Sequence, residues 1–206
     1  MIKSIWIDNF KSLVDFELEF SQFNCLIGLN GSGKSTVLQA LDFLSQLMVG
    51  DLEDWLQLRH WESADLNSKL TKKSNIDFKV LLDLPEFGEV IWSGSINRAQ
   101  LRCTQERVDY NHLTLLRVEG DECALRESIP NPKNAVFTEK FTIVFEYQGS
   151  ILSKLKEKQT TAVLHALKKS ILQIRSLDLL SPELLRSRTK LSSGKLGLGG
   201  QHLSAF

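Results

Sequence analysis

The sequence predicts an α/β fold organised around a glycine-rich loop, and three observations support this prediction. Residues 28–35 match the pattern G-x-x-x-x-G-K-[ST] at every fixed position. Residues 23–27 form a short apolar run before the loop, which predicts a strand. An apolar pattern with helical spacing follows the loop and stops at Gly50. Strand, glycine loop and helix therefore follow one another in the order that a phosphate-binding loop requires.

The residue types of the loop suit the phosphates of a nucleotide. Glycine lets the backbone turn tightly and approach an anion, so that successive N–H groups point inward. Lys34 would supply a charge for the β- and γ-phosphates and Ser35 a hydroxyl for Mg²⁺, while the next helix directs its positive dipole end at the phosphates. The alternative is a glycine-rich turn without a nucleotide. We expect ATP and Mg²⁺ to contact Gly28, Asn30, Gly31, Ser32, Gly33, Lys34, Ser35 and Thr36.

Composition bounds the class of protein. The chain has 206 residues, of which 42% are hydrophobic and 24% charged, as is ordinary for a soluble globular protein. No apolar run reaches the roughly 18 residues of a membrane span, and the N-terminus does not resemble a signal peptide. We therefore expect a cytoplasmic protein with no membrane partner. The three cysteines are widely spaced, which predicts neither a disulfide framework nor a zinc site.

Charge is distributed unevenly along the chain, although the net charge is zero. Residues 1–150 carry 15 Lys and Arg against 22 Asp and Glu, whereas residues 151–206 carry 10 against 3. The basic segment could contact the phosphates of DNA. A solvated helix face is the alternative, because no aromatic side chains alternate with the basic ones to stack on bases. The basic residues include Lys154, Lys156, Lys158, Lys168, Lys169, Arg175, Arg186, Arg188 and Lys190.

Two strands and a polar helical stretch flank the loop and its helix. Residues 2–7 and 15–20 alternate between apolar and polar side chains, which predicts strands. Residues 51–73 are mostly polar, with apolar side chains at helical spacing that predict the anchors of a small core. These anchors are Trp55, Leu58 and Trp61.

The second half of the chain predicts an antiparallel meander followed by helices. Four alternating runs separated by turn signals lie at residues 76–84, 89–96, 100–108 and 112–118. Further on we expect a strand at 141–147, an amphipathic helix at 158–175, another strand at 174–180 and a helical turn from Pro182. The whole chain, 1–206, is predicted to be a single P-loop unit, with strands, loop and first helix in 1–50, a mainly β-meander part in 75–147 and a basic helical segment in 150–206.

The chain resembles a known family in residues 2–36. The run Asn9-Phe10-Lys11-Ser12 in the first connection, together with the glycine loop, is similar to the N-terminal lobe of ABC-type ATPases of the SMC, RecF and OLD group. The resemblance implies a P-loop NTPase fold with a β-rich subdomain packed beside the P-loop sheet. It also implies ATP-driven dimerisation of two heads and a role in DNA repair or anti-phage defence.

The same resemblance implies roles for two residues outside the loop. Lys11 would reach the nucleotide, and Gln148, at the end of the strand predicted for 141–147, would sense Mg²⁺ and the attacking water. Lys34 and Gln148 would then be the catalytic residues. From the residues alone, Lys11 is an exposed loop lysine and Gln148 a surface turn glutamine.

Two other segments imitate parts of an ATPase. Asp83 ends an apolar run as a magnesium-binding acid would, which leaves an AAA+ or RecA-like ATPase as an alternative. Residues 191–195 echo the signature of ABC-type proteins, although residues 197–201 are better interpreted as a glycine loop. No acidic strand is evident before Phe206. We therefore expect the N-terminal half of a head, either shortened or one member of a split pair.

This half would be completed by a C-terminal lobe or a partner chain, and hydrolysis would depend on that part. A homodimer of heads, DNA and an associated nuclease are the further partners that the resemblance implies. A nucleotide-gated binding module without hydrolysis is the alternative of a different class.

Overall fold

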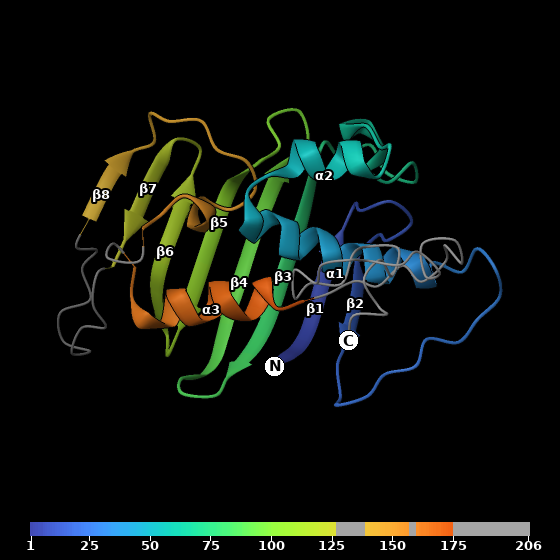
Figure 1. Cartoon of the computed structure of the whole chain (residues 1–206), viewed down its shortest axis with the longest axis horizontal. Coiled ribbons are helices and arrows are strands. Elements are labelled where there is room, and N and C mark those ends of the chain that lie inside the picture. Colours follow the sequence, from blue (N-terminus) through green and yellow to red (C-terminus); the bar gives the residue numbers. More distant parts are fainter. Residues whose placement is uncertain (127–138, 157–159, 175–206) are drawn as a thin grey trace, which may run out of the picture. The chain divides into compact units, whose positions relative to one another are not determined.

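The computed structural model describes residues 1–126, 139–156 and 160–174 of the chain. Eight strands form one antiparallel sheet in the order β2-β1-β3-β4-β5-β6-β7-β8. Figure 1 shows helices α1 and α3 lying across the same face of this sheet. The predicted α/β class is confirmed. The strands are β1 (Ile2–Asp8), β2 (Phe16–Glu19), β3 (Asn75–Leu84), β4 (Gly88–Asn97), β5 (Arg102–Tyr110), β6 (Leu113–Glu119), β7 (Glu122–Leu125) and β8 (Glu139–Thr142), and the helices are α1 (Lys34–Val49), α2 (Leu52–Leu58), η1 (Ser63–Asp65), η2 (Ile151–Ser153) and α3 (Ala162–Leu172).

The meander from β3 to β6 has the arrangement that its alternating sequence predicts. β3 and β4 pair over their whole length, and the turn between them closes where Phe87 N donates to Leu84 O at 3.0 Å. Gly88 ends this turn with φ at +79°, a conformation that costs a glycine little. The antiparallel pairs of β1 with β2 and with β3 extend the same sheet. The β-rich part is thus continuous with β1 and β2 in one sheet, instead of packing beside them.

One face of the sheet forms the core and the other carries charged side chains. Side chains at alternate positions of β1, β3 and β4 are almost completely buried on the helix side. This is expected of an antiparallel sheet covered on one face only. The buried residues of these strands are Ile5, Ile7, Ile76, Phe78, Val80, Leu82, Leu84, Val90, Trp92 and Ile96.

Helix α1 occupies the predicted position and is fixed at its C-terminal end. Gly50 takes the left-handed conformation after the last turn, and its N–H donates to Gln46 O at 3.0 Å. Gly149 packs against the same turn so closely that a Cβ there would lie 2.3 Å from Leu47 O. Ser150 N donates to the same carbonyl at 2.8 Å. The end of α1 is therefore joined to η2.

A buried carboxylate joins the sheet to η2. Glu106 on β5 is 2% exposed and accepts from Trp92 Nε1 and from Ile151 N, each at 2.9 Å. The Ser150 hydroxyl donates to the same carboxylate. Burial raises the pKa of Glu106, although these hydrogen bonds oppose the shift. Neighbouring Cys103 is fully buried, and burial raises the pKa of its thiol as well.

Residues 23–27 do not form the predicted strand. They lie in a long extended loop between β2 and α1, visible in blue in Figure 1. Phe23 is 83% exposed and Ile27 90% exposed. A strand needs a neighbour with free N–H and C=O groups, and in the described part of the chain none lies beside this segment. The apolar side chains of this segment therefore remain exposed.

Other predicted elements are shorter than expected. The strand predicted for residues 141–147 is reduced to β8, because only residues 139–142 pair with β7. The three predicted core anchors do not share one face: Trp55 is buried, Leu58 is 72% exposed and Trp61 is half-buried. Helix α2 ends at Leu58, and His60 has φ at +54°, so the helical spacing does not continue to Trp61.

Several predictions lie outside the described residues. No helix in the described ranges is long and apolar enough to cross a membrane. The strand predicted for 174–180 lies beyond residue 174 except for its first residue, and the helical turn from Pro182, the signature-like residues 191–195 and the glycine loop 197–201 lie entirely beyond it. Five of the predicted basic residues also lie outside the described ranges: Lys158, in the gap between residues 156 and 160, and Arg175, Arg186, Arg188 and Lys190, beyond residue 174.

Candidate nucleotide-binding site

The glycine loop, residues 28–35, leads directly into the N-terminus of α1. Gly31 and Gly33 have φ values of +83° and +88°, a left-handed conformation that disfavours side chains. Gly33 is the N-cap residue, and no side chain caps this end of the helix. The first N–H groups of α1 are therefore available to an anion, and the helix dipole adds a positive potential.

Lys34 folds back onto the glycine loop. Its Nζ donates to Gly28 O at 2.8 Å and to Leu29 O at 2.7 Å, and lies 3.3 Å from Ser32 Oγ. These acceptors are exposed and uncharged. The loop therefore closes on its own lysine, and an incoming phosphate would have to replace these carbonyls as the acceptor.

The Asn-Phe-Lys-Ser element lies beside the glycine loop, as the resemblance predicts. Ser12 Oγ donates to Thr36 Oγ1 at 3.1 Å, and a Cβ on Gly33 would lie 3.4 Å from the same Ser12 oxygen. Lys11 has φ at +49°, and its N–H donates to Leu66 O at 2.8 Å. The structure thus brings Lys11 and the start of α1 together, although they are far apart in the sequence.

Asn9 holds this element in place. Its side-chain amide donates to Lys73 O and to Asn75 O, each at 2.8 Å, and its Oδ1 accepts from Ser68 N at 3.2 Å. The Thr71 hydroxyl donates to the same oxygen. Asn9 is fully buried and has φ at +62°, a region that Asn tolerates better than most residues. Its role here is to position the connection after β1.

Asp8 strengthens the same connection. Its carboxylate pairs with Lys73 and accepts from Asp15 N at 2.8 Å. Burial by itself would raise the pKa of Asp8, but Lys73 and the backbone N–H groups of Asp15 and Asn9 outweigh it. The pKa of Asp8 therefore lies below its usual value.

Trp61 is a part of the site that the sequence reasoning missed. Its spacing predicts an anchor of a small core, but its ring lies under Lys11, whose Nζ is 3.2 Å from the ring centroid. The two residues line a groove of about 590 Å³ together with Ser12, Asn67 and Leu70. Asn67 Oδ1 is buried without a hydrogen-bond partner. In the sequence, only the position of this tryptophan beyond the end of a short helix could have indicated its contact with Lys11.

The surroundings of Lys11 hold the pKa of its ammonium below the usual value. Burial lowers the pKa of Lys11, and the nearby Arg59 charge lowers it further, whereas Asp65 raises it. The aromatic face of Trp61 compensates the ammonium without supplying a full negative charge. The Lys11 ammonium therefore lies over the Trp61 ring in a groove that Asp65 also lines.

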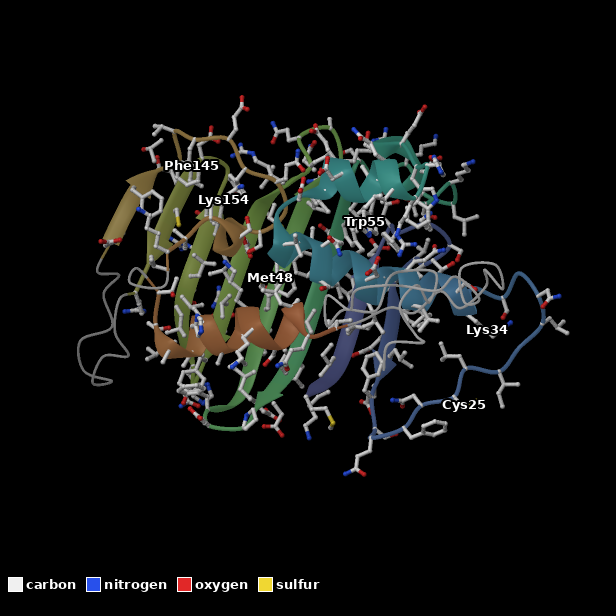
Figure 2. All side chains as sticks on the ribbon, viewed as in Figure 1. Cys25, Lys34, Met48, Trp55, Phe145 and Lys154 are labelled. Carbon is white, nitrogen blue, oxygen red and sulfur yellow. The ribbon has the colours of Figure 1, made fainter. Side chains whose placement is uncertain are left out.

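Gln148 lies at the other end of α1. Its Oε1 accepts from Glu53 N at 3.0 Å, at the start of α2. The 16 residues of α1 separate this position from Lys34, which corresponds to about 24 Å of helix. In Figure 2, Lys34 at the right and Phe145 at the upper left, close in sequence to Gln148, lie well apart. The described structure does not bring Gln148 to the glycine loop, and its magnesium role stays a prediction without structural support.

A polar groove of about 690 Å³ surrounds Gln148. Arg102 and Asp121 line it and form an ion pair at 2.6 Å, and Tyr147 lies under the Arg102 guanidinium at 5.5 Å. This groove is larger than the one beside Lys11 but lies away from the glycine loop. The chemistry of the loop, and not the groove volume, therefore identifies the candidate site.

Asp83 is also separated from the loop. It lies at the N-terminal end of β1, where it accepts from the N-terminal amine through its backbone oxygen and pairs with Lys3 at 3.3 Å. Lys11 follows the opposite end of β1, which spans seven residues or about 20 Å. The AAA+ or RecA-like alternative with Asp83 as the magnesium ligand is not supported, because Asp83 ends an antiparallel hairpin strand on the far side of the sheet. Within the described ranges, no three His, Cys, Asp or Glu side chains gather as a metal site.

The chain has recognisable relatives. Residues 1–170 match the family model described as AAA ATPase domain (AAA_15). The OLD nuclease of Thermus scotoductus is 29% identical over 111 residues, which cover 54% of this chain and 19% of that protein. The DNA replication and repair protein RecF of Porphyromonas gingivalis is 48% identical over 79 residues, which cover 37% and 22%. The chain thus spans about a fifth of the length of these relatives.

Solved structures give a weaker likeness. The recombination mediator protein RecF with ATP aligns with a TM-score of 0.39 at 23% identity, over 55% of this chain and 27% of that one. An SMC ATPase structure aligns with a TM-score of 0.40 at 20% identity, over 55% and 70%. The family match and the curated relatives confirm the resemblance to the N-terminal lobe of the SMC, RecF and OLD group. The chain belongs to the AAA ATPase domain family.

Proposed function

We propose that the chain binds ATP with Mg²⁺ at residues 28–36 and that the bound nucleotide drives engagement with a second ATPase head. The observation that carries this proposal is the uncapped N-terminus of α1 behind two left-handed glycines, with Lys11 held beside it by the contact between Ser12 and Thr36. A row of free N–H groups, a helix dipole and two lysines is an arrangement that suits a polyphosphate.

Each residue of the loop has a defined part in this proposal. The backbone N–H groups of Asn30, Gly31 and Gly33 surround the phosphates, and Gly28 gives the space for the turn. The Ser32 N–H would join them by giving up its hydrogen bond to Leu29 O at 3.2 Å. Lys34 and Lys11 neutralise phosphate charge. Ser35 and Thr36, on the first turn of α1, offer hydroxyl groups, of which Ser35 would hold Mg²⁺. The metal would supply charge neutralisation at the phosphates when bound.

The extended loop before the site supports a complementing lobe or chain. Phe23, Ile27 and Leu29 are each more than 80% exposed, and Leu26 is 37% exposed. A contiguous apolar segment of this kind marks an interaction surface. We propose that a C-terminal lobe or a partner chain covers this segment and contributes the groups that activate water, since Asp83 and Gln148 lie away from the loop. Two such heads would then form a homodimer around the nucleotide.

The relatives suggest the biological setting. One is named as a DNA replication and repair protein and another as a nuclease. We therefore propose a role in DNA repair or anti-phage defence, with DNA and an associated nuclease as partners. Of the basic segment, Lys154, Lys156, Lys168 and Lys169 are in the described range, and Lys168 already donates to Leu152 O at 2.6 Å.

Nucleotide binding is tested with the full chain and a labelled ATP analogue in the presence of Mg²⁺. Lys34→Ala should weaken binding at least tenfold, because the lysine would interact with the phosphates directly. Lys79→Ala is the matched control, since Lys79 is exposed on the open face of the sheet. This variant should bind the ATP analogue with the same affinity as the wild type. Equal affinities for all three proteins would contradict a nucleotide site at the loop.

A nucleotide-gated module without hydrolysis is the second candidate. It is favoured by the separation from the loop of Gln148, expected to sense Mg²⁺ and the attacking water, and of Asp83, the alternative magnesium ligand. Measuring the molar mass in solution with and without a non-hydrolysable ATP analogue distinguishes the two. A nucleotide-dependent doubling of the mass supports head engagement, whereas unchanged mass with intact binding supports the gated module.

A further inference from the structure

Lys11 and Trp61 form the closest contact between a cation and an aromatic ring in the described part of the chain. The Lys11 Nζ lies 3.2 Å above the ring centroid. The hydrogen bond from Lys11 N to Leu66 O fixes the Lys11 backbone, and therefore the point from which the side chain starts. A lysine side chain is a flexible four-carbon stem that can take other directions from a fixed backbone.

The Trp61 ring is itself fixed to helix α1. Its edge packs against Trp55 with the two centroids 5.5 Å apart and the planes at 89°. The Arg59 guanidinium lies 5.0 Å from the Trp61 centroid and donates to Asp42 on α1 at 2.7 Å. Trp55 Nε1 donates to the same carboxylate at 2.8 Å. The ring that holds Lys11 is therefore anchored to the helix that begins at the glycine loop.

The two lysines of the candidate site share one property in the structure. The Lys34 ammonium contacts the uncharged carbonyls of Gly28 and Leu29. The Lys11 ammonium contacts the uncharged face of Trp61, with the Asp65 carboxylate in the same groove. A phosphate is a stronger partner for an ammonium group than a carbonyl or an aromatic face. An ammonium that turns to a phosphate gives up the ring face, so the contact between Lys11 and Trp61 competes with nucleotide binding.

We propose that Trp61 holds the Lys11 ammonium in the nucleotide-free protein and releases it when nucleotide binds, so that Trp61 sets the nucleotide affinity. This inference rests on the proposed function of the glycine loop. An interaction that exists only in the free state opposes binding by its full free energy. Removing the ring while keeping Lys11 therefore tightens nucleotide binding.

A double-mutant cycle on the full chain tests this mechanism. Trp61→Leu should bind the labelled ATP analogue about two- to fivefold more tightly than the wild type, the factor that corresponds to an exposed cation–π contact. In the Lys11→Met background the same change should have no effect, because no ammonium remains to be held. Trp61→Phe keeps an aromatic face and should lie close to the wild type. A ring with only a structural role would weaken binding in both backgrounds.

Tryptophan fluorescence gives a second readout that does not require Trp61→Leu to fold. The chain has four tryptophans, so the signal of Trp61 is the difference between the wild type and Trp61→Phe. Nucleotide should change this difference signal in the wild type, and should not do so in Lys11→Met at saturating nucleotide. Unchanged Trp61 emission on saturation, or tighter binding by Trp61→Leu in both backgrounds, overturns the inference. Absence of nucleotide binding to the wild type would instead overturn the proposed function.

Discussion

The Ser12 hydroxyl lies 3.1 Å from the Thr36 hydroxyl and donates a hydrogen bond to it. This contact joins the connection after β1 to the first turn of α1. Because Lys11 precedes Ser12 and Lys34 lies two residues before Thr36, the same hydrogen bond fixes the spacing between the two lysines. The contact is exposed, so its contribution to folding is small and its main effect is on geometry.

Ser12→Ala should therefore affect nucleotide binding more than stability. We expect the free energy of unfolding to change by less than about 1 kcal/mol, because the remaining Thr36 hydroxyl can bind water. The affinity for an ATP analogue should fall severalfold, since the connection that carries Lys11 is no longer joined to the first turn of α1. Ser93→Ala, on the sheet, serves as the control for both measurements. Loss of stability without loss of affinity would show that the contact is only structural.

Gly149→Ala should be strongly destabilising. Gly149 has φ at +69°, and a Cβ would lie 2.3 Å from Leu47 O and 2.8 Å from Leu47 Cα, which are backbone atoms that cannot move aside separately. Gly120→Ala is a matched control, because Gly120 has φ at +61° with no atom within 4 Å of such a Cβ. We expect about 1–2 kcal/mol for the control, from the left-handed conformation alone, and clearly more for Gly149→Ala. Denaturant unfolding measures both, and equal losses would contradict the close approach to α1.

The contribution of Glu106 to stability should depend on pH. Its pKa is raised by burial, so the folded protein holds the proton more tightly than the unfolded chain. This contribution is fully present below the unfolded-state pKa of about 4.3 and is lost as the pH rises through the raised pKa of the folded state. Above that range the Glu106 carboxylate is charged while buried, which lowers stability. Hydrogen bonds from Trp92, Ser150 and Ile151 offset part of this loss.

Glu106→Gln removes this pH dependence. A protonated Glu106 can donate to Ser150 and accept from Trp92 and Ile151, whereas a glutamine amide in either orientation points an N–H group at another donor. An unsatisfied buried group of this kind costs about 1–3 kcal/mol. We therefore expect Glu106→Gln to be less stable than the wild type, with a larger deficit near pH 4 than at neutral pH. Unfolding free energies measured across this range test it, with exposed Glu89→Gln as the control, and a deficit independent of pH would contradict the argument.

The meander could be predicted from the sequence because its information is local. Each alternating run such as residues 76–84 carries its own buried face, and each turn its own glycine or polar cluster, so boundaries agreed within a few residues. Helix α1 was predicted for the same reason, from its apolar spacing and from Gly50. The α/β class followed from these elements.

The environment of Lys11 could not be predicted, because it depends on pairs of residues distant in the sequence. Nothing in the local pattern places Trp61 under Lys11 or Ser12 against Thr36; these contacts arise only when β1, α1 and the segment before β3 pack together. The strand predicted for residues 23–27 is absent for a different reason. Their apolar composition satisfies the pattern of a strand, but a strand also needs a neighbour, and a single segment cannot specify one.

The three cysteines provide a test of the buried core and of the exposed loop together. Cys103 and Cys123 are almost fully buried, and burial raises the pKa of Cys123 to about 12 and that of Cys103 well above its usual value. Cys25 lies exposed in the extended loop. Because the thiolate is the reactive form and must be reached by the reagent, one thiol per native chain should react rapidly with a disulfide reagent and two only on unfolding. Cys25→Ser should abolish the fast phase, whereas two fast thiols in the native wild type would show that the core is not closed. If a partner covers residues 23–29, as proposed, its binding should slow the reaction of Cys25 and leave the other two thiols unchanged.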